Sequence, residues 1–246
     1  AWGFMAVLFI ARPALAWGPA THIKLAHDLL GQLHLLPVAV AVILSRYRKD
    51  YIFGNIAADM VIAKRLSRVK QFCHHWETGF AILNDARSHQ GRAFALGYLS
   101  HLAADTVSHN KFLPRQMTMT HTTMGLGHLY WEMRADSTIA PRYWEELQDI
   151  LKMVFDEHEA SLHARLMDTF LPFMVNWRLF YRTNQFLSRR MWRKAMGRWY
   201  NVSRWQLSEE LMREYRAECL QRMMDVVARQ RESGVLREDP NGNSAL

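Results

Sequence analysis

The sequence is poor in cysteine, with only Cys73 and Cys219 among its 246 residues. Two thiols exclude a zinc site built from cysteines and allow at most one disulfide, and the sequence leaves open whether these two residues pair. The composition of a disordered protein is absent as well, because 50% of the residues are hydrophobic and only 22% are charged. A chain of this length and composition is expected to bury one core in a single domain.

Acidic residues are scarce relative to basic ones. The chain has 23 aspartates and glutamates against 31 lysines and arginines, which gives a formal charge of +8 and a pI near 9.7. An excess of positive charge favours anionic partners such as phospholipid headgroups, a nucleic-acid backbone or a phosphorylated substrate. The charge alone does not choose among them.

The apolar segment near the N-terminus, from Phe4 to Ala11, is too short to cross a bilayer. It precedes a small-residue motif that ends at Ala16, an order typical of a secretory signal peptide. We therefore expect residues 1–16 to be removed and the protein to be exported, to the periplasm or out of the cell. Processing would give Trp17 a free α-amino group, which can bind a metal ion. The alternative is a partly buried N-terminal helix.

Strand-like alternation is rare, whereas apolar residues recur at helical spacing through nearly the whole chain. The expected fold is therefore all-α, a single-domain multi-helix bundle over residues 17–246. Residues that can bind metals concentrate in 17–136, a helical remainder is expected over 137–238, and the tail 239–246 is expected to fray. Pro114 is expected to end the helix that covers residues 91–110.

One of these helices carries three potential metal ligands four residues apart, in His101-Leu-Ala-Ala-Asp105-Thr-Val-Ser-His109. Positions i, i+4 and i+8 lie on one face of an α-helix, so two imidazoles and a carboxylate project into the same space. This spacing outlines a metal site.

A second helix repeats the spacing with His128 and Glu132, and three further candidates, His22, Asp59 and His74, lie upstream. Any one of these residues alone is more often an ordinary core or surface residue. Several ligand pairs together are what a site for more than one metal ion requires.

These residues resemble the zinc-dependent phospholipase C family, which shares its fold and a trinuclear zinc site with the secreted single-strand-specific zinc nucleases. The resemblance covers residues 17–136. The motifs that carry it are Trp17-x4-His22, Gly54-Asn-Ile-Ala-Ala-Asp59, His74-x-Trp76, Gly97-x3-His101-x3-Asp105-x3-His109 and His128-x3-Glu132.

The resemblance implies three Zn²⁺ ions bound in a cleft. It assigns one ion to Asp59, His74, His101 and Asp105, a second to Asp105 as a bridge, His22 and the amine and carbonyl of Trp17, and a third to His109, His128 and Glu132. Asp59 is also implied as the catalytic residue that orients or deprotonates water. Two alternatives stay open: His75 competes with His74, and His121 competes with His109 because the step from Asp105 to His109 is short for the family.

The implied function is hydrolysis of a phosphodiester, most directly by a phospholipase C acting on phospholipids. Glu132 favours this branch, since the nucleases typically have aspartate there. The five-residue step from Trp17 to His22 favours the alternative, a single-strand nuclease or nucleotidase. A further alternative is a zinc-binding membrane-surface protein without catalysis.

Arginine and tryptophan are concentrated in residues 177–205. This composition suits peripheral contact with an anionic membrane surface or with a nucleic-acid backbone. An amphipathic bundle helix with solvated arginines is the simpler interpretation, and we prefer it for this stretch.

Overall fold

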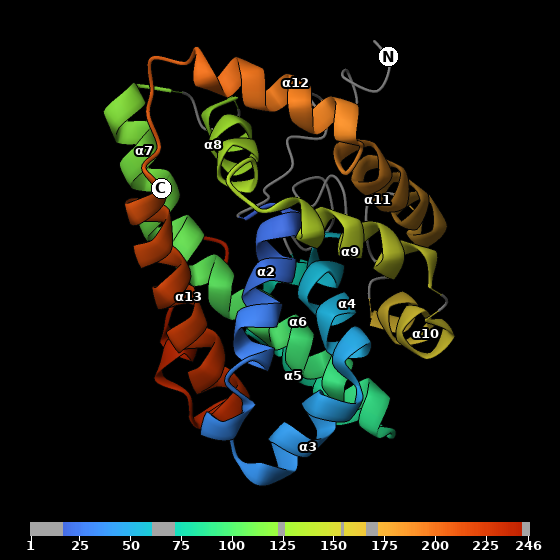
Figure 1. Cartoon of the computed structure of the whole chain (residues 1–246). Coiled ribbons are helices and arrows are strands. Elements are labelled where there is room, and N and C mark those ends of the chain that lie inside the picture. The colour runs from blue at the N-terminus through green and yellow to red at the C-terminus, as the bar shows by residue number, and fades with distance from the viewer. Residues whose placement is uncertain (1–16, 61–71, 123–125, 154, 166–171, 243–246) are drawn as a thin grey trace.

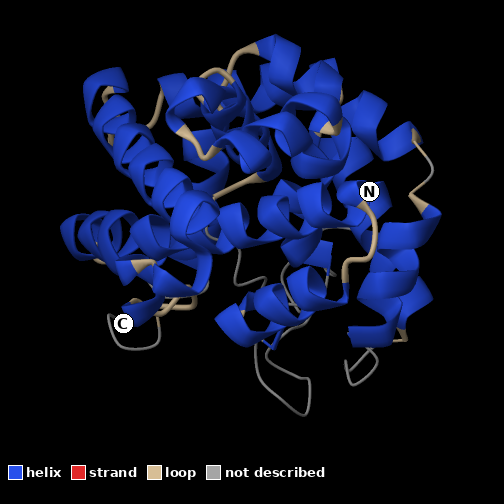
Figure 2. Cartoon of the chain, turned by 90° about the horizontal axis from the view of Figure 1, so that it is seen from below, coloured by secondary structure: helices blue, strands red, loops and turns tan. Residues whose placement is uncertain are grey.

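The computed structural model describes residues 17–60, 72–122, 126–153, 155–165 and 172–242 (Figure 1). All regular secondary structure in these ranges is helical (Figure 2), which confirms the all-α prediction. No helix in these ranges is long and apolar enough to span a membrane. The predicted signal peptide, residues 1–16, lies outside the described residues.

Helix α6 (His89–Val107) is the central element. Its N-terminus is capped by Ser88, whose hydroxyl accepts a hydrogen bond from the backbone N–H of Gly91 at 2.8 Å. From residue 93 onward every side chain of α6 is buried, because other helices surround it. These are α2 (Pro19–Leu30), α4 (Arg48–Ala57), α5 (Trp76–Asp85) and α13 (Glu209–Arg229).

Two glycines allow α4 and α6 to touch backbone to backbone. A Cβ on Gly97 would lie 2.1 Å from the carbonyl oxygen of Tyr51, and a Cβ on Gly54 would lie 2.1 Å from that of Phe94. No side chain larger than hydrogen fits at such distances. Beside the crossing, the Tyr51 hydroxyl donates to Ser100 Oγ at 2.9 Å. The crossing therefore fixes the position of the second half of α6 against the end of α4.

The chain does not leave the helix near Pro114, so that prediction is wrong. After α6 it forms one π-helical segment, Ser108–Phe112, and continues as α7 (Leu113–Thr120). Pro114 lies in the first turn of α7, where the fixed φ and the missing N–H of proline are tolerated. A π-helical turn inside a helix is frequent at functional sites.

The remaining helices cover this centre. Helix α12 crosses the top of the molecule in Figure 1, above α8 and α9, while α3 lies at the opposite end. Their bounds are α3 (Val38–Arg46), α8 (Leu126–Asp136), α9 (Pro141–Lys152), α10 (Asp156–Arg165), α11 (Phe173–Leu187) and α12 (Arg190–Asn201).

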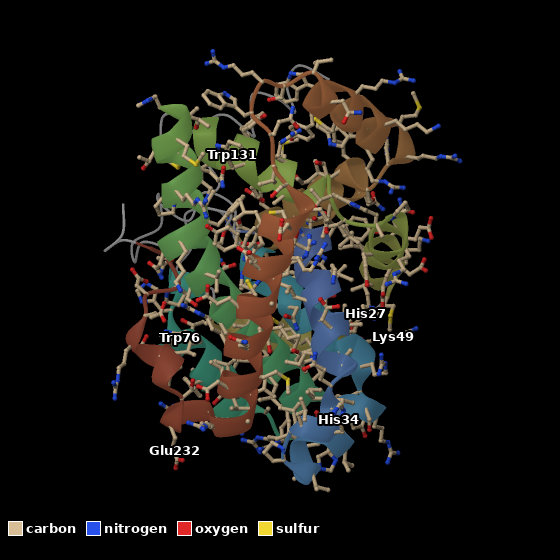
Figure 3. All side chains as sticks on the ribbon, turned by 60° about the vertical axis from the view of Figure 1, so that its left-hand side comes forward. His27, His34, Lys49, Trp76, Trp131 and Glu232 are labelled. Carbon is tan, nitrogen blue, oxygen red and sulfur yellow. The ribbon has the colours of Figure 1, made fainter. Side chains whose placement is uncertain are left out.

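The described part of the C-terminal tail, residues 239–242, packs against the body of the protein instead of fraying. Asn241 is 7% exposed and donates from Nδ2 to the carbonyl oxygen of His74 at 3.0 Å. Just upstream, the indole of Trp76 (Figure 3) donates to the carbonyl oxygen of Glu238 at 2.9 Å. The tail 239–246 was expected to fray from its composition; the hydrogen bond of Asn241 holds its described part, and residues 243–246 lie outside the described residues.

Candidate metal centre

His101 and Asp105 lie one turn apart on α6 and are both completely buried. His101 Nε2 is 3.1 Å from Asp105 Oδ2, as the four-residue spacing predicts. On the other side of the ring, Nδ1 lies 2.8 Å from the carbonyl oxygen of Asn55 at the end of α4, to which it donates. This hydrogen bond leaves the lone pair on Nε2, the arrangement found in metal-binding histidines.

His74 reaches the same point from a short 3-10 helix, Phe72–His74. Its Nε2 lies 3.1 Å from His101 Nε2, 3.2 Å from Asp105 Oδ2 and 3.3 Å from Asp59 Oδ1. Ligand atoms around a tetrahedral zinc ion, at roughly 2.0 to 2.2 Å from the metal, are roughly 3.3 to 3.6 Å apart. The spacing of these atoms therefore matches a zinc ligand set to within a few tenths of an ångström.

His22 approaches Asp105 from the opposite direction, on α2. Its Nε2 is 3.3 Å from Asp105 Oδ1, and its ring stacks on that of His101 with 3.9 Å between centroids. The two carboxylate oxygens of Asp105 thus face different imidazoles, Oδ1 towards His22 and Oδ2 towards His74 and His101. Two groups that could each hold a metal ion share His101: His22, His101 and Asp105, and Asp59, His74 and His101.

Burial and charge set the protonation of these groups. Burial lowers the pKa of His22, and the nearby His101 lowers it further, which keeps the imidazole neutral and able to bind a metal. Burial alone would raise the pKa of Asp105, but the charge of His101 and the close imidazoles hold it well below its usual range. A neutral His22 beside an ionised Asp105 is the pair of protonation states that a zinc site requires.

A second observation supports zinc binding by these residues. Both ring nitrogens of His22 and both carboxylate oxygens of Asp105 are buried and make no hydrogen bond of normal geometry within the described residues. Buried polar atoms without hydrogen bonds cost free energy unless something else satisfies them. A cation at the point where they converge would satisfy all of them at once.

Asp59 lies at the open edge of this cluster. It belongs to the 3-10 helix Ala58–Met60, which directly follows α4. Its side chain is 10% exposed, whereas those of His74, His101 and Asp105 are 0 to 1% exposed. Among these four residues, Asp59 is therefore best placed to contact solvent and substrate.

The third predicted ligand set is less tightly gathered. His109, in the π-helical segment, and His128, on α8, are buried with 5.2 Å between their ring centroids. Glu132 is buried one turn after His128. Within the described residues these three do not form a group with ligand atoms inside 4.8 Å of one another. The structure buries all three residues at the π-helical segment and α8, with Glu132 on the same helix as His128 and one turn after it.

The structure places the two alternative ligands, His121 and His75, differently from the residues they compete with. His121 is exposed at the end of α7, with a positive φ of 50°, while His109 is buried against His128. His75 is half-buried at the start of α5 and belongs to neither potential metal group, whereas His74 belongs to one. The geometry favours His109 and His74.

Trp17 is completely buried beside this cluster. Its indole donates to the carbonyl oxygen of Ala104 at 3.1 Å, and its ring lies 4.7 Å from that of Phe112. These contacts anchor the start of α2 next to α6, one helical turn from His22. The role of a Trp17 amine depends on residues 1–16, which the structure does not describe.

Asp136, at the end of α8, is a residue that the sequence analysis missed. Its carboxylate accepts hydrogen bonds from Thr21 Oγ1 at 2.6 Å, Thr21 N at 2.9 Å and Ala20 N at 3.2 Å, so it caps the N-terminus of α2. Burial raises its pKa to about 6. It follows Glu132 by four residues, so the helical spacing that starts at His128 extends one turn further than was noticed.

The two cysteines are both buried, and neither forms a disulfide within the described residues. Cys73 precedes His74, and its sulfur lies 3.4 Å from His74 Nδ1. Burial raises the pKa of the Cys219 thiol, which keeps it protonated. The open question of pairing is thereby answered: the structure contains no disulfide between them.

A pocket of about 650 Å³ opens between α8, α9 and α12, and Glu132 is the predicted metal ligand that lines it. Gly18, Glu132 and Asp136 line it where α2 meets α8, and α12 contributes Arg190, Arg193 and Lys194. A pocket of this size is large enough for a small-molecule substrate.

Comparison with known proteins identifies the family to which the chain belongs. The model of the family described as zinc dependent phospholipase C matches residues 21–180, which is more than half of the chain. No curated protein and no solved structure matches the sequence. The matched region includes the six buried histidines and acids on α2, α6 and α8 together with Asp59 and His74. The chain therefore belongs to the zinc-dependent phospholipase C family.

Proposed function

We propose that this protein is a phospholipase C that hydrolyses the phosphodiester of phospholipids on the glycerol side. The observation that carries the proposal is the arrangement of Asp105, whose two buried carboxylate oxygens face separate imidazoles. A carboxylate in this position can bridge two cations, as two-metal phosphodiester hydrolysis requires. Membership of the family makes zinc the expected metal.

The proposed zinc ligands are assigned from the distances between their side chains. His74, His101 and Asp59 would hold one ion, with Asp105 shared between it and a second ion at His22. After signal-peptide removal the amine of Trp17 would join His22, and a third ion would bind at His109, His128 and Glu132. The third ion needs the ligand atoms of these three residues to lie closer to one another than they do here.

The zinc ions would supply positive charge for the phosphodiester and lower the pKa of water from ~15.7 towards ~7. Asp59, at the exposed edge, accepts the proton of the attacking water. The water oxygen forms the new bond to phosphorus, the bond from phosphorus to the glycerol oxygen breaks, and that oxygen leaves with a proton as diacylglycerol. His22 stays neutral because burial lowers its pKa, and His101 is fixed in orientation by its hydrogen bond to the Asn55 carbonyl.

The neighbouring pocket is the proposed place for the substrate. Besides its charged groups it is lined by Trp144, Trp192, Leu187 and Ile139, which give it an apolar part. A polar end that includes the proposed ligand Glu132 and an apolar wall suit a phospholipid. Export and peripheral contact with an anionic membrane surface belong to the same proposal, since the substrate lies in membranes.

The direct test is to assay the zinc-loaded protein on dihexanoyl phospholipids and on single-stranded DNA. We expect release of diacylglycerol and no nucleotide products. Nucleotide release without diacylglycerol would establish the nuclease alternative and overturn this proposal.

The non-catalytic alternative is tested by Asp59→Asn. We expect this substitution to lower phospholipid hydrolysis by roughly 100-fold or more, since it removes the proton acceptor. Equal turnover in the variant and the wild type would contradict the role given to Asp59. No turnover in either protein, with zinc bound, would support the non-catalytic alternative.

A further inference from the structure

The wall of the pocket that α12 contributes is positively charged. Arg190, Arg193 and Lys194 all line the pocket, and α12 contains no acidic residue. Apolar packing also holds α12, since the Trp192 ring lies 4.8 Å from that of Phe186 on α11.

These three cations have no counter-charge of their own. None of them forms an ion pair with any residue that the structure describes. The Nε of Arg193 is buried and finds no acceptor within the same ranges. The Arg193 guanidinium lies 5.9 Å from the centroid of the Trp144 ring. The aromatic ring holds the guanidinium in place, and its buried N–H donor has no acceptor among the described residues. Such a cation can bind an anionic ligand.

The acids of the pocket do not supply that anion. Asp136 already accepts three hydrogen bonds from the start of α2, and Glu132 is a proposed zinc ligand. Glu145, on α9, also lines the pocket but is exposed. It forms no ion pair with these cations within the described residues.

A single phosphodiester does not account for the cationic wall either, because the zinc ions would neutralise the one negative charge that it carries. A second anionic group on the same lipid would account for it. A choline headgroup, being cationic, would be repelled by the same wall.

We infer that Arg190, Arg193 and Lys194 form a headgroup subsite that selects phospholipids whose headgroup carries a further anionic group, such as a phosphate ester, over phospholipids with choline. The inference rests on the proposed phospholipase activity and adds to it the class of substrate.

The test compares kcat/KM of the zinc-loaded enzyme on dihexanoyl phosphatidylinositol 4-phosphate and on dihexanoyl phosphatidylcholine. We expect the wild type to prefer the first lipid by at least tenfold. Arg193→Gln and Lys194→Gln should each lower kcat/KM on the first lipid by roughly tenfold, chiefly through KM, and raise it on the second, because less positive charge then repels the choline group. Arg193→Lys should recover part of the loss. Arg213→Gln, which removes an exposed cation on α13, is the control and should change neither value.

Lys194 is exposed, so its variant is expected to fold even if Arg193 proves necessary for packing against Trp144. Equal losses on both lipids would show that the cations bind the scissile phosphate and would overturn the subsite. So would a wild-type preference for phosphatidylcholine.

A binding measurement separates this inference from the proposed function. Titration calorimetry of the zinc-loaded protein with inositol 1,4-bisphosphate and with phosphocholine should show tighter binding of the bisphosphate, weakened roughly tenfold by Lys194→Gln. If no lipid is hydrolysed but this pattern holds, the proposed function fails and the anion subsite stands. If lipids are hydrolysed but both headgroups bind alike, the subsite fails and the proposed function stands. Preferred hydrolysis of single-stranded DNA would reject both.

Discussion

The inner layer of the molecule, formed by α2, α4 and α6, differs in kind from the outer wall formed by α9 and α12. The inner layer holds the predicted metal ligands His22, His101 and Asp105 at 0% exposure, and two of its helices touch through Gly54 and Gly97. On the outer wall, Met191, Trp199 and Val202 are 53 to 85% exposed, and a glycine on α12 has open space around it. The difference indicates that the chemistry belongs to a rigid centre, and recognition of the substrate to a surface that can vary.

The largest difference between the two regions is expected when a residue at the centre of the inner layer is changed. Asp105→Asn replaces the carboxylate that faces His22 on one side and His74 and His101 on the other. We expect kcat/KM on dihexanoyl phosphatidylcholine to fall by at least about 1000-fold, because charge stabilisation is lost where it acts most strongly. Asp149→Asn, an exposed change on α9, is the control and should have no effect. Comparable activities of the two variants would show that the inner layer is not the catalytic part.

A second test compares one glycine from each region. Gly97→Ala would place a Cβ 2.1 Å from the Tyr51 carbonyl oxygen, so α4 and α6 must separate. We expect the free energy of unfolding to fall by about 3 kcal/mol, as for an overpacked core. Gly197→Ala on α12 meets nothing within 4 Å and should leave stability unchanged or raise it by up to about 1 kcal/mol. Urea unfolding measures both, and equal losses would contradict the rigid-centre interpretation.

The boundary between the two regions is tested at Asp136, which caps α2 and also lines the pocket. Asp136→Asn keeps one acceptor oxygen and removes the charge at the helix N-terminus, so His22 is held less firmly. We expect kcat/KM to fall by roughly tenfold with zinc content unchanged, in the range seen when a partner that orients a metal ligand is removed. A loss of less than twofold would show that the cap does not position His22.

The same variant predicts a pH dependence. Burial raises the pKa of Asp136 to about 6, above ~3.9 in the unfolded chain, so ionisation of this carboxyl costs stability as the pH rises from about 4 to about 6. The free energy of unfolding of Asp136→Asn, compared with wild type at each pH, should therefore improve over this interval and then level off. A difference that stays constant from pH 4 to pH 7 would contradict the raised pKa.

The smallest expected effect concerns the outer face of α12. Arg198→Gln removes an exposed cation beside Trp199, which is 53% exposed. If this face contacts anionic membranes, binding to vesicles of phosphatidylglycerol and phosphatidylcholine should weaken by about fivefold, while turnover of soluble dihexanoyl lipids stays the same. Co-sedimentation measures the binding, and unchanged binding would remove α12 from the membrane contact.

The sequence predicts the inner layer well where one helix determines the geometry. The four-residue steps from His101 to Asp105 and from His128 to Glu132 place side chains on one face of a helix, and both pairs are buried in the structure. The all-helical fold follows for the same reason, since helical periodicity is a local signal.

What the sequence does not predict depends on contacts between distant segments. The carbonyl of Asn55 that orients His101 is 46 residues away, Asp136 caps a helix 115 residues upstream, and Asn241 reaches His74 across 167 residues. None of these contacts has a local pattern. The continuation of the helix through Pro114 was missed because a π-helical turn has no recognisable sequence signature here. The cationic wall of the pocket became visible only once α12 was placed against α8 and α9.

The central claim, that the inner layer is a zinc centre, is tested most directly by the metal content of the purified protein. Elemental analysis after gel filtration should find tightly bound zinc in the wild type and in His75→Ala, and at least one zinc ion fewer per chain in His74→Ala. A wild-type protein without zinc, or a His74→Ala protein with the wild-type amount, would contradict the account.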